Sequence, residues 1–179
     1  SSGGIFGELA AQMLQRGGLI AGAVMDDTAV RHVLIDRPEE LPPLCKSKYL
    51  QSHTEGIYQT VKRQLAAGKE VLFVGTPCQV AGMIAFCGPA LRSKLLAVDL
   101  VCHGVPSDHI LDLFAYERQD KIDRILSFRD KMDGWQQSFV CNYLNGNGEQ
   151  IRVDSKNNVF LQLFSGGLMM RGSCYRCQF

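Results

Sequence analysis

The chain has 179 residues, which is enough for one substantial hydrophobic core. Hydrophobic residues make up 46% of it and charged residues 21%, a composition that excludes disordered, collagen-like and coiled-coil proteins. The formal net charge is +1, and the 19 Lys and Arg are interleaved with 18 Asp and Glu, so we expect no nucleic-acid partner. No signal peptide and no run of 18 apolar residues is visible, which predicts a cytoplasmic protein without a membrane span.

Seven cysteines stand out in a chain of this size. A disulfide-stabilised scaffold is usually shorter and has an even number of cysteines at regular spacing. The count therefore favours thiolate chemistry, with a metal or a redox partner, in a reducing compartment.

The first third of the chain predicts a helix, a hairpin and a second helix. Apolar residues recur at helical spacing after Gly4 and stop at Gly17-Gly18, and Asp26-Asp27-Thr28 separates two apolar runs of strand length. The expected elements are a helix over 5–16, strands over 19–25 and 29–35, and, after a proline-containing loop, a helix with an apolar face from Ile57 to Leu65 that Thr54 can cap and Gly68 can end.

The middle of the chain alternates as parallel α/β units do. Each apolar run is followed by a short turn and a helical pattern, and the runs are continuous, as in strands covered on both faces. The expected elements are strands over 71–74 and 95–101 and helices over 80–86 and 107–117.

The last third changes to shorter, alternating patterns. Asn145-Gly146-Asn147-Gly148 is typical of a tight turn between two strands. The expected elements are strands over 122–128, 138–144 and 150–153 and a short helix over 159–164, before a glycine-containing loop leads to a Cys-x-x-Cys at Cys174 and Cys177.

These patterns predict an α/β fold: a mixed sheet with central parallel α/β units and an added antiparallel hairpin region. We expect a single domain over 1–179. If it divides, an α/β core over 1–118 precedes a strand-rich segment over 119–179 that carries the Cys-x-x-Cys.

Cys78 and Cys102 occupy equivalent places, each in the turn that leaves the carboxyl end of an expected strand. Ligands of open α/β sheets bind at that edge, so these two cysteines are expected to converge. Cys78 also lies near a helix N-terminus, which favours a thiolate. With Cys174 and Cys177, whose spacing lets two thiolates bind one metal centre, they form a set of four candidate ligands.

Four thiolates suit either zinc or a [4Fe–4S] cluster, and ligand chemistry alone does not separate the two. Structural zinc typically takes two close pairs, whereas this chain offers one pair and two separated cysteines. The spacing favours a cluster. A zinc site, a redox dithiol at Cys174 and Cys177, and thiols without a ligand role remain open alternatives.

The remaining cysteines and histidines have plainer interpretations. His103 directly follows Cys102 and is the candidate for proton delivery or hydrogen bonding at the site, although a structural role is equally compatible with its position. Packing roles are expected for the other three cysteines, and structural or solvent-exposed roles for the other three histidines, namely Cys45, Cys87, Cys141, His32, His53 and His109.

Two polar segments could contact a cofactor. Ser2-Gly3-Gly4 offers free backbone N–H groups at a helix start, suited to phosphate or to the edge of a flavin, or else forms an ordinary helix cap. Lys46-Ser47-Lys48-Tyr49 supplies two cations and a stacking ring, or else a solvated loop. A Gly-x-Gly-x-x-Gly fingerprint is missing, so a dinucleotide would not be held in the usual Rossmann manner.

Five motifs, in order, resemble those of the coenzyme F420 hydrogenase/dehydrogenase beta subunit family, and together they span the whole chain. They are Ser2-Gly3-Gly4, Lys46-Ser47-Lys48-Tyr49, Gly75-Thr76-Pro77-Cys78-Gln79, Asp99-Leu100-Val101-Cys102-His103-Gly104 and Ser173-Cys174-Tyr175-Arg176-Cys177-Gln178-Phe179.

The resemblance implies an iron–sulfur flavoprotein oxidoreductase. Such a protein passes electrons between an Fe–S relay and FAD, with hydride exchange to a second, small-molecule substrate such as the deazaflavin coenzyme F420. Its expected partners are other redox subunits or a ferredoxin-like module. Members commonly continue beyond both ends of the matched region, so the chain is expected to be the middle of a longer subunit.

The resemblance also assigns residues. It places a [4Fe–4S] cluster on the four candidate thiolates, Cys78, Cys102, Cys174 and Cys177. We expect the flavin site to be lined by Ser2, Gly3, Gly4, Lys48, Tyr49 and Thr76, with His103 as the residue for proton delivery.

Overall fold

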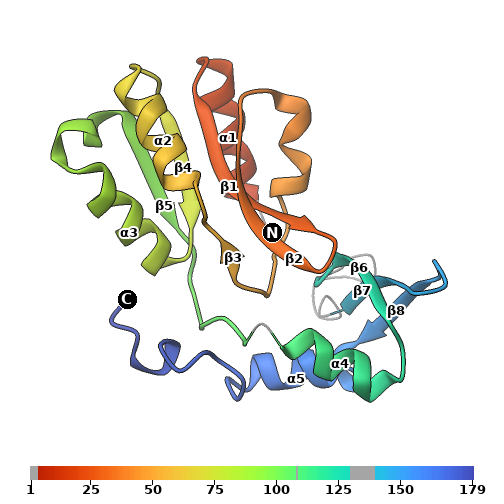
Figure 1. Cartoon of the computed structure of the whole chain (residues 1–179). Helices are drawn as coiled ribbons and strands as arrows, with labels where there is room; N and C mark the ends of the chain where they lie inside the picture. Colours follow the sequence, from red (N-terminus) through yellow and green to blue (C-terminus); the bar gives the residue numbers. More distant parts are fainter. Residues whose placement is uncertain (1–3, 108, 130–139) are drawn as a thin grey trace.

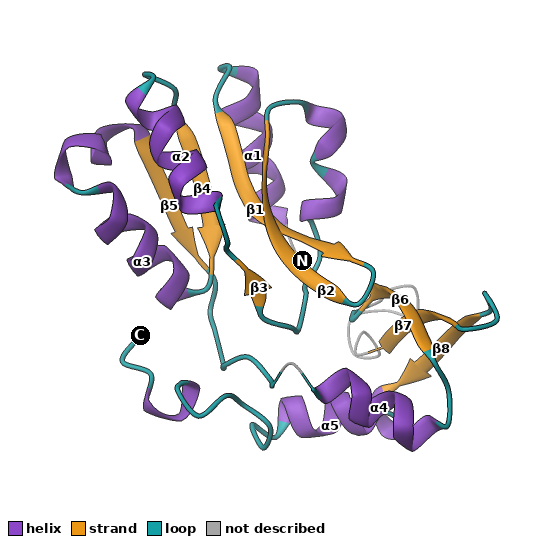
Figure 2. Ribbon diagram, viewed as in Figure 1, coloured by secondary structure: helices purple, strands orange, loops and turns teal. Residues whose placement is uncertain are grey.

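The computed structural model contains a five-stranded sheet covered by helices and, beside it, a smaller three-stranded sheet with its own two helices (Figures 1 and 2). The structure describes residues 4–107, 109–129 and 140–179. The α/β class and the mixed sheet with an antiparallel hairpin are confirmed. In the described part of the chain, no helix is long and apolar enough to cross a membrane.

The larger sheet has the strand order β3-β2-β1-β4-β5. The strands β1, β4 and β5 run parallel, while β2 returns antiparallel to β1 through a turn in which Asp27 has φ 51°. The short β3, which the sequence did not predict, runs parallel to β2. The strands are β1 (Leu19–Asp26), β2 (Ala29–Ile35), β3 (Ser52–His53), β4 (Val71–Gly75) and β5 (Leu95–Asp99).

Helices cover both faces of this sheet. Alternate residues of β4 point to opposite faces, so Phe73 packs with α2 (Ile57–Ala66) and α3 (Pro77–Cys87), while Leu72 packs with α1 (Gly4–Gln15). Both side chains are fully buried, and each contributes about 2 kcal/mol by burial. The layers are completed by three short 3-10 helices, η1 (Pro38–Glu40), η2 (Pro42–Leu44) and η3 (Pro89–Lys94).

A second core joins the helices that follow β5 to the smaller sheet. Phe114 and Tyr143 meet edge to face at the centre of this core, with ring centroids 5.9 Å apart. The buried Tyr143 hydroxyl donates to Asp120 at 2.9 Å and accepts from Arg118 at 3.1 Å. The elements are α4 (Ile110–Arg118), β6 (Ile122–Ser127), β7 (Val140–Asn145), β8 (Gln150–Asp154), η4 (Ser155–Asn157) and α5 (Val159–Ser165).

Several element boundaries differ from the sequence prediction, among them the helix expected to be capped by Thr54, which begins at Ile57 after Gly56. The strand expected over 95–101 ends at Asp99, because β5 lies at the sheet edge and the next residues leave it; Val101 is 93% exposed. The helix expected from 80 begins at Pro77, whose fixed φ suits a first helical turn. The helix expected from 107 begins at Ile110. Residues 138 and 139 of the expected strand over 138–144 lie outside the described residues.

Candidate functional site

Cys78 lies at the carboxyl edge of the larger sheet, in the first turn of α3. The Gln79 side chain accepts a hydrogen bond from the Thr76 N–H at 3.0 Å and so fixes the start of the helix. The Thr76 hydroxyl lies 3.2 Å from Cys78 Sγ, and the thiol is exposed. A thiolate here would be stabilised by the helix N-terminus.

Cys102 follows the neighbouring strand and lies at the same edge. β4 and β5 pair in parallel up to Gly75 and Asp99, and the Leu100 N–H still donates to the Gly75 carbonyl at 3.1 Å. Three residues after the strand end, the Cys102 thiol is exposed. The predicted placement of both cysteines beyond neighbouring parallel strands is confirmed.

The C-terminal segment brings the Cys-x-x-Cys to this edge. After α5 the chain runs back beneath the carboxyl ends of the strands (Figure 1). It is fastened to the segment after Cys102 by backbone hydrogen bonds, Arg171 N–H to Val105 O at 2.9 Å and Ser107 N–H to Met169 O at 3.2 Å. Residues far apart in the sequence therefore share one site.

Gly104 makes this close approach possible. Its φ is +111°, a value that L side chains rarely adopt, and its N–H donates to Cys102 Sγ at 3.3 Å. A Cβ built at this position would lie 3.0 Å from Met170 Sδ and 3.3 Å from Cys174 Cβ. The glycine of the Cys102-His103-Gly104 motif is thus the contact between two of the three cysteine-bearing segments.

Tyr175, between the two cysteines of the motif, fixes the shape of the last segment. Its hydroxyl donates to the Gly167 carbonyl at 2.8 Å and accepts from the Met170 N–H at 3.3 Å. Cys174 itself lies in a short 3-10 turn, η5 (Cys174–Arg176), and the Cys177 N–H closes this turn on the Cys174 carbonyl.

Cys102 lies close enough to the other three candidate thiols for their charges to act on it. Burial raises the pKa of Cys102, the hydrogen bond from Gly104 lowers it, and the negative charges of Cys78, Cys174 and Cys177 raise it further. Within the described residues, however, no group of three or more His, Cys, Asp or Glu is arranged to hold a metal ion. The four thiols thus lie at one edge of the sheet, but their positions are not those of ligands around one metal ion. Four thiolates as donors suit zinc or an Fe–S cluster.

The other cysteines lie elsewhere. Cys87 and Cys141 are buried in the first and second cores, and Cys45 is partly buried in the loop after η2. His103 is exposed next to Cys102, as expected for a residue at the rim of the site.

A cavity of about 150 Å³ lies where the sheet splits, and Thr76 links it to Cys78. β1 pairs with β4 only up to Ala21 and Phe73, whereas β1 and β2 stay paired as far as Asp26 and Ala29. This split-sheet cavity is lined by Thr76, by Lys48 and, from α1, by Phe6. Two of the predicted flavin residues, Lys48 and Thr76, therefore lie on one cavity.

Lys48 is engaged with the backbone rather than free at the cavity. Its Nζ donates to the carbonyls of Pro43, Leu44 and Cys45 at 2.9, 2.9 and 2.8 Å and to that of Lys46 at 3.2 Å. Burial lowers the pKa of Lys48 to about 8. The ammonium group fastens the turn that forms the cavity wall.

Tyr49 and Gly4, two other predicted flavin residues, do not line this cavity. The Tyr49 ring stacks on Phe164 with centroids 4.6 Å apart and packs at the edge of the second core. Gly4 begins α1, while Ser2 and Gly3 lie outside the described residues. Direct flavin contacts of these residues stay predictions.

Sequence reasoning missed three residues of the cavity wall. His32, Ser52 and Gln79 line the cavity and are joined by hydrogen bonds. In the alternation of β2, His32 shares one face with Val30 and Leu34, and a polar residue on that apolar face is a signal that could have indicated it.

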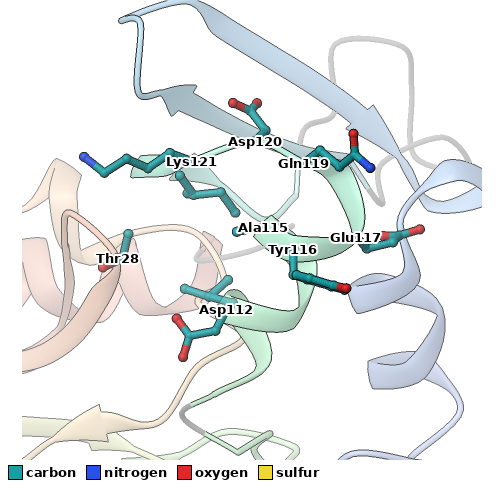
Figure 3. Close-up of a pocket in the computed structure, with 10 residues that line it drawn as sticks. Thr28, Asp112, Ala115, Tyr116, Glu117, Gln119, Asp120 and Lys121 are labelled. Atoms are coloured by element: carbon teal, nitrogen blue, oxygen red, sulfur yellow. The ribbon is translucent and has the colours of Figure 1, made fainter.

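A larger opening of about 720 Å³ lies elsewhere, between α4 and β6. Figure 3 shows its rim of polar and charged side chains, among them Asp112, Glu117 and Lys121. Its aromatic side chain, Tyr116, is 83% exposed. Because the opening shares no residue with the thiols or the split-sheet cavity, its size does not make it the candidate site.

The family comparison matches residues 68–179 to the C-terminal region of the coenzyme F420 hydrogenase/dehydrogenase beta subunit. This is well over half of the chain. The chain belongs to this family. The matched region holds all four candidate thiols of the site, Cys78, Cys102, Cys174 and Cys177. The comparison with curated proteins found no match.

Among solved structures, the chain is similar to one from the xenon-derivatised F420-reducing [NiFe] hydrogenase complex of Methanosarcina barkeri. The TM-score is 0.59 at 15% sequence identity, so the likeness concerns the fold. The match covers 98% of this chain and 59% of the other, so the chain spans well under two thirds of the length of its structural relative.

Proposed function

We propose that this member of the family is the electron-transferring part of an iron–sulfur flavoprotein oxidoreductase. Cys78, Cys102, Cys174 and Cys177 hold a [4Fe–4S] cluster, and the split-sheet cavity takes the redox-active ring of FAD. The observation that carries the proposal is the position of Thr76, which lines the cavity while its hydroxyl lies 3.2 Å from Cys78 Sγ. One residue thus separates the proposed flavin from the proposed cluster.

The cofactors would supply the redox chemistry, hydride exchange at the flavin and single-electron transfer at the cluster. The chain holds the thiolates on three segments that Gly104 and the pairing of Val105 with Arg171 keep together. The first turn of α3 offsets negative charge near Cys78. The exposed His103, next to Cys102, is the proposed residue for proton delivery.

The size of the cavity limits what it can hold. Pockets for whole organic ligands usually measure about 300–1,000 Å³, so a cavity of about 150 Å³ takes one part of a dinucleotide. The rest would lie towards Lys46, an exposed cation at the rim. The proposed second substrate is a deazaflavin coenzyme. The proposed partners are other redox subunits in the cytoplasm, in keeping with the family description and with the hydrogenase complex that contains the structural relative.

Metal and cofactor analysis of the full-length protein, purified without air, tests the proposal. We expect iron with acid-labile sulfide, bound FAD and the corresponding visible absorbance. Zinc without iron would instead make the four cysteines a structural metal site of a binding module. A protein with neither metal, whose activity survives chelation and is lost on alkylation, would be a thiol–disulfide oxidoreductase using Cys174 and Cys177.

A further inference from the structure

His32 is a buried histidine that the proposed mechanism does not use. It lies on β2 with 7% of its surface exposed, and its ring stacks on Phe73 at a centroid distance of 5.3 Å. Nε2 lies 3.0 Å from the Val74 carbonyl oxygen and Nδ1 lies 2.7 Å from Ser52 Oγ. The imidazole therefore bridges the split in the sheet, from β3 on one side to β4 on the other.

The two partners fix the protonation of the ring. A carbonyl oxygen only accepts hydrogen bonds, so Nε2 carries the proton that binds Val74. Burial lowers the pKa of His32, with the Val74 hydrogen bond acting in the opposite direction, so the ring is neutral and Nδ1 is an acceptor. The Ser52 hydroxyl must then donate its only proton to Nδ1.

This leaves the Ser52 oxygen with acceptor capacity alone. Ser52 is buried and lines the split-sheet cavity beside Thr76 and Gln79. The Ser52 backbone carbonyl accepts from the Gln79 amide at 3.1 Å, and Gln79 in turn fixes the Thr76 N–H at 3.0 Å. Ser52 is thereby held on both sides, with its hydroxyl bound to His32 and its backbone carbonyl bound to the turn that carries Cys78.

We propose that His32 is a positioning residue that presents the Ser52 hydroxyl oxygen to the cavity as an acceptor for an N–H group of the bound flavin ring. This inference rests on the proposed function, since it names the group that fills the cavity. It also specifies the ligand chemistry, because the Ser52 hydroxyl already donates its proton to His32 and can pair with the ring only by accepting from an N–H group.

FAD binding to the full-length protein, measured anaerobically by titration with FAD, tests the proposal. Ser52→Ala removes one hydrogen bond to the ligand and is expected to weaken FAD affinity by about ten-fold. Ser52→Thr keeps a hydroxyl and is expected to retain most of the affinity. His32→Phe keeps an aromatic ring beside Phe73 but removes both ring nitrogens, so the Ser52 hydroxyl loses its acceptor. The FAD affinity of this His32 variant should fall as much as that of Ser52→Ala. The double variant should bind FAD no more weakly than either single variant.

The control is His53→Gln, which changes the exposed histidine next to Ser52 on the same strand. A structural defect alone would lower thermal stability and iron content. The proposed role instead changes the FAD midpoint potential in Ser52→Ala and leaves it unchanged in His53→Gln.

The outcomes separate the two proposals. If the wild type binds FAD and folded Ser52→Ala binds it within about two-fold of the wild type, this inference is wrong and the proposed function stands. Additive losses in the double variant would equally contradict positioning by His32. If the wild type binds no FAD, the proposed flavoprotein function fails and this inference fails with it.

Discussion

Two regions of the protein place cysteine side chains in opposite environments, one buried and one exposed to solvent. In the second core, Cys141 lies on β7 with 1% of its surface exposed, and burial raises its pKa to about 12. It packs there as a small apolar side chain that stays protonated. At the carboxyl edge of the larger sheet, Cys78, Cys102 and Cys177 are exposed on turns and loops.

The difference shows that position relative to the strand end, rather than cysteine content, decides the chemistry available to a thiol. A residue within a strand is enclosed by neighbouring strands and helices, as Cys141 is in one core with Val153 of β8 and Phe114 of α4. A residue beyond the strand end meets other loops, as Cys102 meets the C-terminal segment through Gly104. Thiolates and ligands need the second environment.

Replacing one cysteine in each region by serine should give the largest difference between the two regions, in cluster content and in stability. Cys102→Ser should abolish the visible Fe–S absorbance of the anaerobically reconstituted full-length protein, because it removes one of four proposed ligands. Cys141→Ser should retain the absorbance and lose about 2 kcal/mol of unfolding free energy, because it buries a hydroxyl in an apolar core. Absorbance spectra and urea unfolding measure the two effects.

Two outcomes would contradict this assignment of ligands. Loss of the cluster in both variants would show that the spectrum reports general disruption. Retention of the cluster in both would remove Cys102 from the ligand set.

Gly104 tests whether the edge region depends on the close approach of its segments. Gly104→Ala should destabilise the protein by about 2–3 kcal/mol, since alanine strains a backbone at φ +111° and its Cβ meets Met170 and Cys174. The midpoint temperature of thermal unfolding and the iron content of the reconstituted protein should both fall. Gly172→Ala is the matched control, because a Cβ there meets nothing within 4 Å. Equal behaviour of the two variants would show that the approach at Gly104 is not required.

Most of the elements could be predicted because their apolar periodicity is local. The hairpin around Asp27, the buried run of β4 and the two helices on the face of Phe73 all follow from spacing along the chain. The end of β5 could not be predicted, because Leu100 and Val101 continue the apolar run and only their place outside the sheet exposes them. Exposed apolar residues after an edge strand have no local signature.

The site could be predicted only where its residues follow strand ends. That rule indicated the region of Cys78 and Cys102, and the spacing of the Cys-x-x-Cys added Cys174 and Cys177 to the candidate ligands. The split-sheet cavity depends on where the pairing of β1 with β4 stops, which is a tertiary property. His32 was therefore assigned no special role, although it bridges the split to Val74. Lys48 was expected to face a ligand, and its ammonium binds four backbone carbonyls instead.

Lys48 gives the smallest expected effect, at the boundary between the two environments. Burial lowers its pKa from 10.5 to about 8, so the folded protein releases this proton at lower pH than the unfolded chain does. Between these values the unfolded state binds more protons, and raising the pH therefore stabilises the wild type relative to Lys48→Met. Urea unfolding at about pH 8 and about pH 10 should show the stability difference growing in favour of the wild type.

The control for this last prediction is Lys94→Met, which removes an exposed lysine whose Nζ donates to the single carbonyl of Gly68 at 3.2 Å. Comparing the two variants cancels the loss of one positive charge and leaves the effect of burial at Lys48. A stability difference that shrinks as the pH rises would contradict the prediction. It would mean that the four carbonyl acceptors hold the proton on Lys48 more strongly than burial removes it.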